Sequence, residues 1–285
     1  MAIQDFLDFR NLENKRCQFE LQVSQIRTGR NCLENNKQLF FELTYPSRLI
    51  KGLIEFVNSN MKNNKMRYRD SEGTVIIRGD HGSGKTHALL ATYNLFADYD
   101  IAAEWLQEHN IKFNKFNGFA IKNKSNSCLI SLGTEVEERS WQVVFKSLGK
   151  ENLLSGGQEP PSSSLIHKLA KSKDTAIFID DLDQFFHQLK KKNKDKLIKA
   201  NQNFIADLLA EVVKNDKLMV FIAALGTAQE VKELFSHHEV ITKDTTTLAQ
   251  KNKFIFYHLF DEIKNQQFKA NINPVIESYL EKYET

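Results

Sequence analysis

The sequence predicts an α/β protein with a three-layer fold, in which a mostly parallel central sheet carries helices on both faces. Short apolar runs rich in β-branched residues alternate along the chain with segments of helical period. Such alternation favours parallel strands joined by crossover helices. A glycine-rich segment with the spacing of a phosphate-binding loop follows the first such run, and acidic residues end a later one. Open α/β sheets bind ligands at the carboxyl ends of their strands, where both features would lie.

The chain before the first core strand is predicted to be partly helical. Residues 1–39 are polar and mixed in composition, and we expect an N-terminal arm or a small helical cap there. Ser47 is suited to cap a helix because apolar residues follow it at helical spacing, namely Leu49, Ile50, Leu53, Ile54 and Val57. Asn58–Asp70 is expected to be a polar, basic linker.

The core is predicted to contain four strands and the helices that join them. The expected strands are Thr74–Arg78, Cys128–Leu132, Ala176–Ile179 and Leu218–Leu225. The expected helices are His87–Phe96, Ile101–Asn110, Glu135–Leu148, Leu165–Ala170, a segment with its apolar face at Phe204–Val213, and Ala228–Phe235. Asn114–Asn126 and Leu153–Ser164 are expected to be loops, the second because of its Gly-Gly and Pro-Pro pairs.

Composition and length are those of a globular protein. The chain has 285 residues, 41% hydrophobic and 26% charged, enough for one large domain or two small ones. It contains no apolar run of membrane-spanning length, and Met1–Arg10 is too acidic and interrupted for a signal peptide. The cysteines Cys17, Cys32 and Cys128 have no metal or disulfide spacing. We therefore expect a cytoplasmic protein with no membrane association.

One segment carries the spacing Gly-x4-Gly-Lys-Thr of the phosphate-binding loop of nucleoside-triphosphatases. It consists of Gly79, Asp80, His81, Gly82, Ser83, Gly84, Lys85 and Thr86. Glycine lets such a loop turn tightly and direct its N–H groups at a phosphate. Lys85 is predicted to contact the β- and γ-phosphates, and the Thr86 hydroxyl to bind Mg²⁺. The helix that follows would direct its positive end at the same anion.

A second acidic signal follows the strand Ala176–Ile179. Asp180 is predicted to hold Mg²⁺, and Asp181 to orient the water that attacks the nucleotide. Asp183 is either a supporting acid or a helix N-terminal charge. Thr227 follows the next apolar strand, where it could contact the γ-phosphate or the attacking water, or cap a helix. The alternative for the acids is a strand that merely ends in acidic turn residues.

Together these residues resemble the additional-strand (ASCE) class of P-loop NTPases, in particular AAA+ ATPases and the related KAP and STAND NTPases. Gly79–Thr86 matches the Walker A motif and Ile177–Asp181 matches Walker B, with Phe178–Asp183 similar to the KAP form. Thr44–Ser47 and Gly84–His87 are similar to large ATPases of phage-defence systems such as BREX. The resemblance covers about residues 40–260, which we expect to form the ATPase core.

The resemblance implies further expectations about the nucleotide site and the C-terminal region. His87 joins the phosphate loop in the predicted nucleotide-binding set, and Tyr45 is expected to contact adenine. Phe254–Ile263 is similar to the last sheet strand and first lid helix of initiator-like AAA+ proteins. Residues 261–285 would then begin a helical lid or tail that is incomplete, because too few residues follow for a full lid.

Two departures from the family pattern predict slow hydrolysis. AAA+ ATPases supply arginines near the last strand and from the lid, whereas Arg139 is the last arginine of this chain. Lys251 and Lys253 lie near that position, but lysine lacks the planar guanidinium fork. Asp181 is shorter than the glutamate usual at its position. Either the chain is a fragment of a longer protein, or the finger comes from another region or from a partner.

The sequence thus predicts an Mg²⁺-dependent ATPase that acts as a homo-oligomer or within a larger complex, of an anti-phage defence or DNA-associated kind. The alternative is a nucleotide-binding switch or scaffold with little hydrolysis. Lys190–Lys199 contains six lysines, which form either a solvated face or a contact for the phosphates of a nucleic acid. A GTPase is disfavoured because no Asn-Lys-x-Asp sequence occurs, and a small-molecule kinase because paired acids favour water as the nucleophile.

Overall fold

The computed structural model of the chain describes its central region. The described residues are 35–59, 61–62, 65–66, 73–80, 82–97, 99–112, 126–134, 137–154, 156, 158–171, 174–225, 229–235 and 241–243. All of them belong to one compact unit that spans Phe19–Thr246. The predicted N-terminal cap lies outside the described residues except for its last few positions. So do Phe254–Ile263 and the predicted lid at residues 261–285.

The fold is α/β, as the sequence predicts, and its centre is a parallel sheet of five strands in the described part of the chain. Their order across the sheet is β4-β5-β6-β3-β7, and every neighbouring pair is parallel. The strands are β3 (Thr74–Arg78), β4 (Asn126–Ser131), β5 (Thr175–Asp180), β6 (Leu218–Ala224) and β7 (Ile241–Lys243). β1 (Met61–Lys62) and β2 (Lys65–Met66) form a separate antiparallel pair within the predicted linker.

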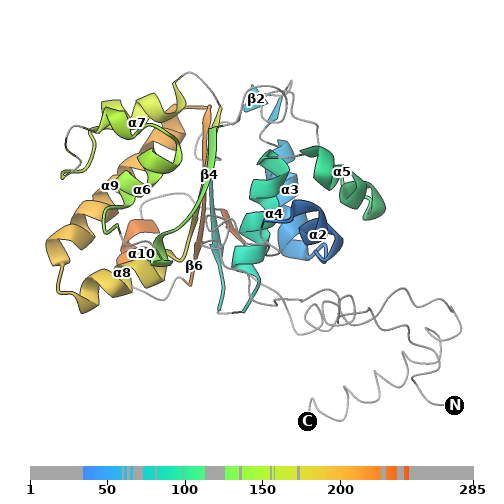
Figure 1. The fold of residues 1–285 in the computed structure, drawn as a ribbon, viewed down its shortest axis with the longest axis horizontal. Helices are drawn as coiled ribbons and strands as arrows, with labels where there is room; N and C mark the ends of the chain where they lie inside the picture. Colours follow the sequence, from blue (N-terminus) through green and yellow to red (C-terminus); the bar gives the residue numbers. More distant parts are fainter. Residues whose placement is uncertain are drawn as a thin grey trace, which may run out of the picture. The chain divides into compact units, whose positions relative to one another are not determined.

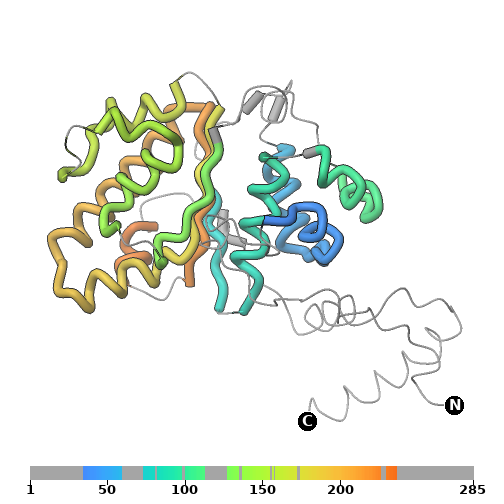
Figure 2. The backbone as a smooth tube through the Cα atoms, in the orientation of Figure 1, coloured from blue at the N-terminus to red at the C-terminus, as the bar shows by residue number. Residues whose placement is uncertain are grey.

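Helices cover both faces of the sheet (Figure 1). One face carries α2 (Lys37–Glu42), α3 (Arg48–Ser59), α4 (Lys85–Ala97) and α5 (Tyr99–Glu108). The other carries α6 (Ser140–Ser147), α7 (Ser163–Ala170), α8 (Leu182–Lys191), α9 (Asp195–Lys214) and α10 (Gln229–Phe235). Two short 3₁₀ turns, η3 (Leu132–Thr134) and η4 (Glu151–Leu153), flank α6. Figure 2 shows that α3 and α4, far apart in the sequence, run side by side, and the two helices are in contact.

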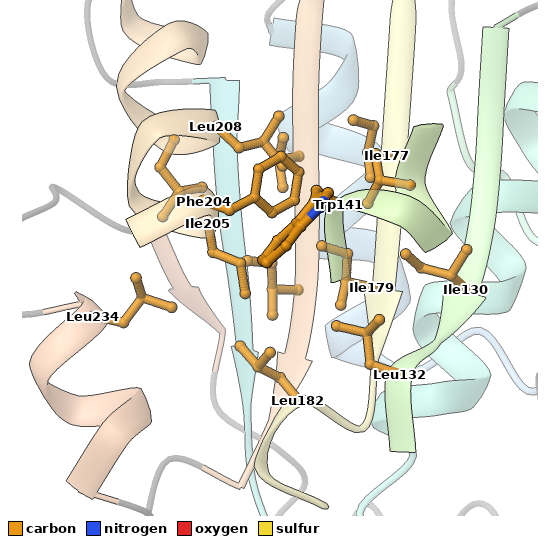
Figure 3. Packing of buried hydrophobic residues seen from close by; sticks show 14 of the residues in the cluster. Ile130, Leu132, Trp141, Ile177, Ile179, Leu182, Phe204, Ile205, Leu208 and Leu234 are labelled. Carbon is orange, nitrogen blue, oxygen red and sulfur yellow. The ribbon is translucent and has the colours of Figure 1, made fainter. Parts of the chain in front are cut away.

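The core consists of two apolar layers because side chains alternate between the faces of each strand. On the face covered by α4, Phe178 and Phe221 stack with ring centroids 4.6 Å apart, and Phe96 meets both edge-on. On the opposite face, Trp141 packs against Phe204 among isoleucines of β5 and leucines of the surrounding helices (Figure 3). Strands buried on both faces explain why the predicted strands are continuous apolar runs.

Most predicted elements are confirmed, with shifts at their ends. Ser47 caps α3, because its hydroxyl accepts a hydrogen bond of 3.2 Å from the Ile50 amide. The helix expected over Glu135–Leu148 is shorter, since α6 begins only at Ser140. The residues before α6 include η3, whose Gly133 carbonyl is bonded to Gln188 of α8. Contacts with α8, and not a first helical turn, therefore hold this segment. None of the described helices is long and apolar enough to cross a membrane.

The strand connections change direction between β3 and β6. β3 leads through α4 and α5 to β4 at one edge of the sheet, whereas β6 leads through α10 over the opposite face to β7 at the other edge. Adjacent strands whose connections depart in opposite directions form a topological switch point, and the crevice outside their carboxyl ends is where such sheets bind ligands. The same rule therefore points to the segments immediately after Arg78 and Ala224 as the candidate binding site.

Candidate active site

The two sequence motifs meet at this switch point. The phosphate loop follows β3, and the acidic residues follow β5, with β6 between the two strands. The side chain of Thr86 lies near enough to the carboxylate of Asp180 to lower its pKa. The two groups predicted to bind Mg²⁺ are thus brought together, although they lie on different elements of the chain.

The phosphate loop turns at two of its glycines. Gly82 and Gly84 have φ angles of 72° and 85°, in the left-handed region that side chains disfavour. Gly79, also expected to permit the turn, is not among the positive-φ residues. Ser83 Oγ is buried and has no hydrogen-bond partner. The loop opens directly into α4, so the first amide groups of this helix face the loop without helical acceptors. His81 lies outside the described residues.

Lys85 is bonded to its own loop. Its Nζ donates hydrogen bonds of 2.6 Å to the carbonyl oxygen of Gly79 and 2.7 Å to that of Asp80. Burial lowers the pKa of Lys85, and the nearby carboxylates, Asp180 foremost, oppose this shift. The ammonium therefore lies at the mouth of the loop, between main-chain carbonyls and the acids of β5.

Asp180 is a buried carboxyl group, only 2% exposed. Burial raises its pKa to about 7, and the neighbouring Asp181 adds to the shift, while hydrogen bonds from Thr86 and from the Asp181 amide oppose it. A buried carboxylate beside a hydroxyl is a hard-oxygen donor set suited to Mg²⁺, which usually takes one or two carboxylates plus phosphate oxygens. Among the described residues no group of three or more His, Cys, Asp or Glu could hold a metal.

Asp181 has an unusual backbone and a defined side-chain partner. It caps α8 with φ 58° and ψ 35°, a left-handed conformation that is uncommon for a residue other than glycine. Its Oδ2 accepts a hydrogen bond of 2.8 Å from Ser131 Oγ. Ser131 is the last residue of β4 and pairs in register with Asp180. It was not among the predicted site residues, although a polar residue that ends an apolar strand of a parallel sheet is a signal that could identify it.

Asp183 connects the acidic end of β5 to the end of β6. It is buried, and its Oδ2 accepts a hydrogen bond from the Leu225 amide, while its Oδ1 has no hydrogen-bond partner. Its negative charge also acts on Lys85. Asp183 therefore links the ends of β5 and β6, and it also lies in the first turn of α8, so both predicted roles, a supporting acid and a helix N-terminal charge, stay open. Thr227 lies outside the described residues, so its predicted role is still a prediction.

The segment before the core is tied to the phosphate-loop helix. His87 Nε2 lies 2.9 Å from Thr44 Oγ1, and the His87 ring stacks on Phe40 with centroids 4.9 Å apart. Thr44 Oγ1 donates its proton to the Phe40 carbonyl at 2.6 Å, so His87 Nε2 is the donor to Thr44. Tyr45 follows Thr44 and is half-buried. His87 thus has a structural role, and it holds the predicted adenine segment beside α4.

The lysine-rich segment lies at the end of α8 and the start of α9, and half of its lysines have acidic partners. Lys190 pairs with Glu230, and Lys192 and Lys194 pair with Glu138. The other three, Lys191, Lys196 and Lys199, are exposed. The cluster is therefore partly neutralised within the protein, which reduces the charge available to nucleic acid. Cys128 is buried, and the other two cysteines lie outside the described residues.

No protein-family model matches the sequence, and no characterised protein matches it significantly. Inferences about function therefore rest on the geometry of this site.

Proposed function

We propose that this protein binds Mg·ATP in the phosphate loop and hydrolyses it slowly. The observation that carries this proposal is the approach of the Thr86 side chain to the buried carboxylate of Asp180, whose pKa it lowers. It unites a hydroxyl of the loop with a buried carboxylate of another strand at the switch point of the sheet. A magnesium ion held by these two groups would neutralise charge on the phosphate oxygens of the bound nucleotide.

The chain's own residues have distinct roles in the proposed reaction. Lys85 exchanges its carbonyl partners for phosphate oxygens, and the unpartnered hydroxyl of Ser83 supplies a further hydrogen bond. Asp181, held by Ser131, orients a water for attack on the γ-phosphorus. The new bond joins the water oxygen to phosphorus, and the bond between the γ-phosphorus and the bridging oxygen breaks. ADP leaves, and the proton lost by the water passes to the carboxylate of Asp181 or to the phosphate product.

The test compares wild-type protein with Lys85→Ala and Asp181→Asn. We expect Lys85→Ala to lose ATP binding in isothermal titration calorimetry, and Asp181→Asn to keep binding but lose phosphate release. Lys214→Ala and Asp207→Asn, exposed residues of α9, are matched controls. Omission of Mg²⁺ should abolish turnover, and GTP should be a poorer substrate if the Tyr45 segment recognises adenine. Wild-type protein that neither binds nor hydrolyses ATP would refute the proposal.

A nucleotide-controlled switch is the second candidate. In the structure Lys85 is engaged by its own loop, and Arg139, the last arginine, is bonded to Gln158 at 2.7 Å and lies 3.5 Å from Glu137. Without an arginine at the phosphates, the transferring group lacks a cation worth about 10³ to 10⁵ in rate in GTPases. A single-turnover experiment separates the two functions. Retention of unhydrolysed ATP over hours supports the switch, whereas repeated turnover supports the enzyme.

Assembly with other molecules is a further part of the proposal. The resemblance to AAA+ and phage-defence ATPases suggests a homo-oligomer or a larger complex that would contribute the missing arginine. Sedimentation velocity with and without a non-hydrolysable ATP analogue tests self-association. Nucleic acid stays a separate hypothesis, and unchanged salt-dependent DNA binding after charge reversal of Lys191, Lys196 and Lys199 would argue against it.

A further inference from the structure

The lysine-rich end of α8 holds the connection that leads from β4 to α6. Glu138 of this connection is paired with Lys192, at 2.9 Å, and with Lys194. Hydrogen bonds from Lys194 and Lys192 lower the pKa of Glu138, so the carboxylate stays charged in this position. The main-chain carbonyl of Glu138 also accepts a hydrogen bond of 3.0 Å from the buried side chain of Asn201. The far end of the connection is therefore fixed by a side chain of α9 and by side chains of the turn between α8 and α9.

The near end of the same connection lies directly against α8. Gln188 Nε2 donates a hydrogen bond of 2.6 Å to the carbonyl oxygen of Gly133. A Cβ atom at Gly133 would lie 2.7 Å from Cβ of Asp181 and 3.1 Å from Cβ of Gln184. This is closer than side-chain carbons approach one another, so only glycine permits the contact. The backbone at Gly133 therefore packs against the first turn of α8 with no side chain between them.

These contacts follow one face of α8. Gln184, Gln188 and Lys192 are spaced four residues apart, and residues at this spacing lie above one another on a helix. Asp181 stands at the head of the same row as the N-cap of the helix. Along the connection, Ser131, Gly133 and Glu138 meet this row in order. We call the contacts of Gly133 and Glu138 with Gln188, Lys192 and Lys194 the β4–α8 seam.

We propose that the β4–α8 seam positions the catalytic carboxylate, by holding Ser131 at the distance from which its hydroxyl fixes Asp181. Lys192 and Lys194 are in this view positioning residues, and their role is internal to the protein. The inference rests on the proposed hydrolysis of ATP, in which Asp181 orients water.

The physical reason is that the carboxylate of Asp181 is not oriented by its own helix. Its backbone is in a sparsely populated conformation, and no side-chain cap bond ties its carboxylate to α8. Among the described residues, the hydrogen bond from Ser131 Oγ to Oδ2 is the one that sets the direction of the carboxylate. Ser131 ends β4, and any displacement of the residues after it changes the position of that hydroxyl. Misplacement of a catalytic group by about 1 Å can cost about 10²-fold in rate.

The seam also gives the site a dependence on ionic conditions. The side chains of Lys192, Lys194 and Glu138 are 55%, 40% and 21% exposed, so salt screens their attraction. The Gly133 contact and the hydrogen bond from Gln188 lie deeper and depend little on salt. High ionic strength should therefore weaken the ion pairs of Glu138 first. The resulting displacement of the connection should then reach Ser131.

The decisive experiment combines Lys192→Gln with Lys194→Gln in the full chain. We expect kcat for ATP to fall by about threefold to tenfold, while KM changes less than about twofold, because the seam positions the base and does not bind nucleotide. Hydrogen exchange of the nucleotide-free protein should become faster in peptides that cover residues 131–140 and 181–188. The matched control, Lys196→Gln with Lys199→Gln, removes the same charge from exposed lysines of the cluster and should change neither quantity.

Restoration of opposite charges provides the second arm. Glu138→Lys combined with Lys192→Glu and Lys194→Glu should recover the slow exchange and most of the kcat. If these charge-reversed proteins do not fold, hydrogen exchange of the wild-type protein is compared at low and high salt. Exchange at residues 131–140 should become faster at high salt, and Glu138→Gln should abolish this salt dependence. Three outcomes would overturn the inference. Hydrogen exchange could be unchanged in the double variant, its kcat could increase, or the control pair could have an equal effect. If the wild-type protein does not turn over ATP, only the proposed hydrolysis is refuted. Hydrogen exchange of the double variant still tests whether the seam holds Ser131 and Asp181 in place.

Discussion

Ser131 Oγ donates a hydrogen bond of 2.8 Å to Asp181 Oδ2, although fifty residues separate them in the chain. Parallel pairing of β4 with β5 places the two strand ends side by side, with Ser131 opposite Asp180. The carboxylate that follows β5 therefore has a fixed partner before any nucleotide binds. A preset orientation of this kind removes reorganisation from the reaction and is the basis of the first prediction.

Substitution of Ser131 by alanine should lower kcat and leave nucleotide affinity unchanged. The variant loses one charge-assisted hydrogen bond, worth about 1.5 to 3 kcal/mol, so we expect a fall in kcat of about tenfold to about a hundredfold. Steady-state phosphate release and calorimetric ATP binding measure the two quantities. Ser131→Thr keeps the hydroxyl and should retain most of the activity. Equal activity of both variants would show that the hydrogen bond does not matter.

Substitution of Asp183 by alanine should destabilise the protein. Its carboxylate accepts the Leu225 amide in a buried position, and removal leaves that amide without its partner. An unsatisfied buried donor costs about 1 to 3 kcal/mol, which urea unfolding can detect. Asp183→Asn keeps an acceptor oxygen and should lose less stability. If asparagine and alanine cost the same, the negative charge near Lys85 is what matters instead.

Substitution of Gly133 by alanine should affect both stability and turnover. The new Cβ would lie 2.7 Å from Cβ of Asp181, so the backbone of one of the two segments must move. Overpacking of this kind costs about 1 to 3 kcal/mol. Gly156→Ala is the comparison, because its Cβ meets no atom within 4 Å and its cost is backbone strain alone at a φ of 70°. Gly156→Ala should therefore lower the melting temperature without changing kcat, whereas Gly133→Ala should change both.

His109 should make a contribution to stability that is lost in mildly acid solution, opposite in sign to that of Asp180, whose raised pKa favours the folded state as the pH falls. Burial lowers the pKa of this imidazole, Lys51 lowers it further, and Glu108 opposes the shift. Because the folded state disfavours the charged form, the unfolded chain binds more protons once the pH falls below 6.5, the ordinary pKa. The contribution of His109 to the free energy of unfolding then decreases until the pH passes below the lowered pKa. Urea unfolding at several pH values measures the slope, and His109→Gln should flatten it.

The strands and the residues of the two motifs could be predicted from the sequence because each depends on local pattern. Strands buried on both faces are continuous apolar runs, and the glycines of the phosphate loop meet a conformational requirement at Gly82 and Gly84. Helix starts were less accurate. α6 begins later than the periodicity suggests, because the residues before Ser140 are held by α8 and α9, which lie far along the chain.

The sequence by itself determined that an α/β sheet carries a phosphate-type loop after one strand and acids after another, since both signals lie within short segments. Only the tertiary structure decided that β6 lies between those strands, that Thr86 reaches Asp180, and that Ser131 holds Asp181. It also decided that Lys192 and Lys194 are partners of Glu138 rather than an unpaired basic patch. The reason is that strand order and cross-strand contacts arise from chain segments far apart in sequence, whose pairing no local period records.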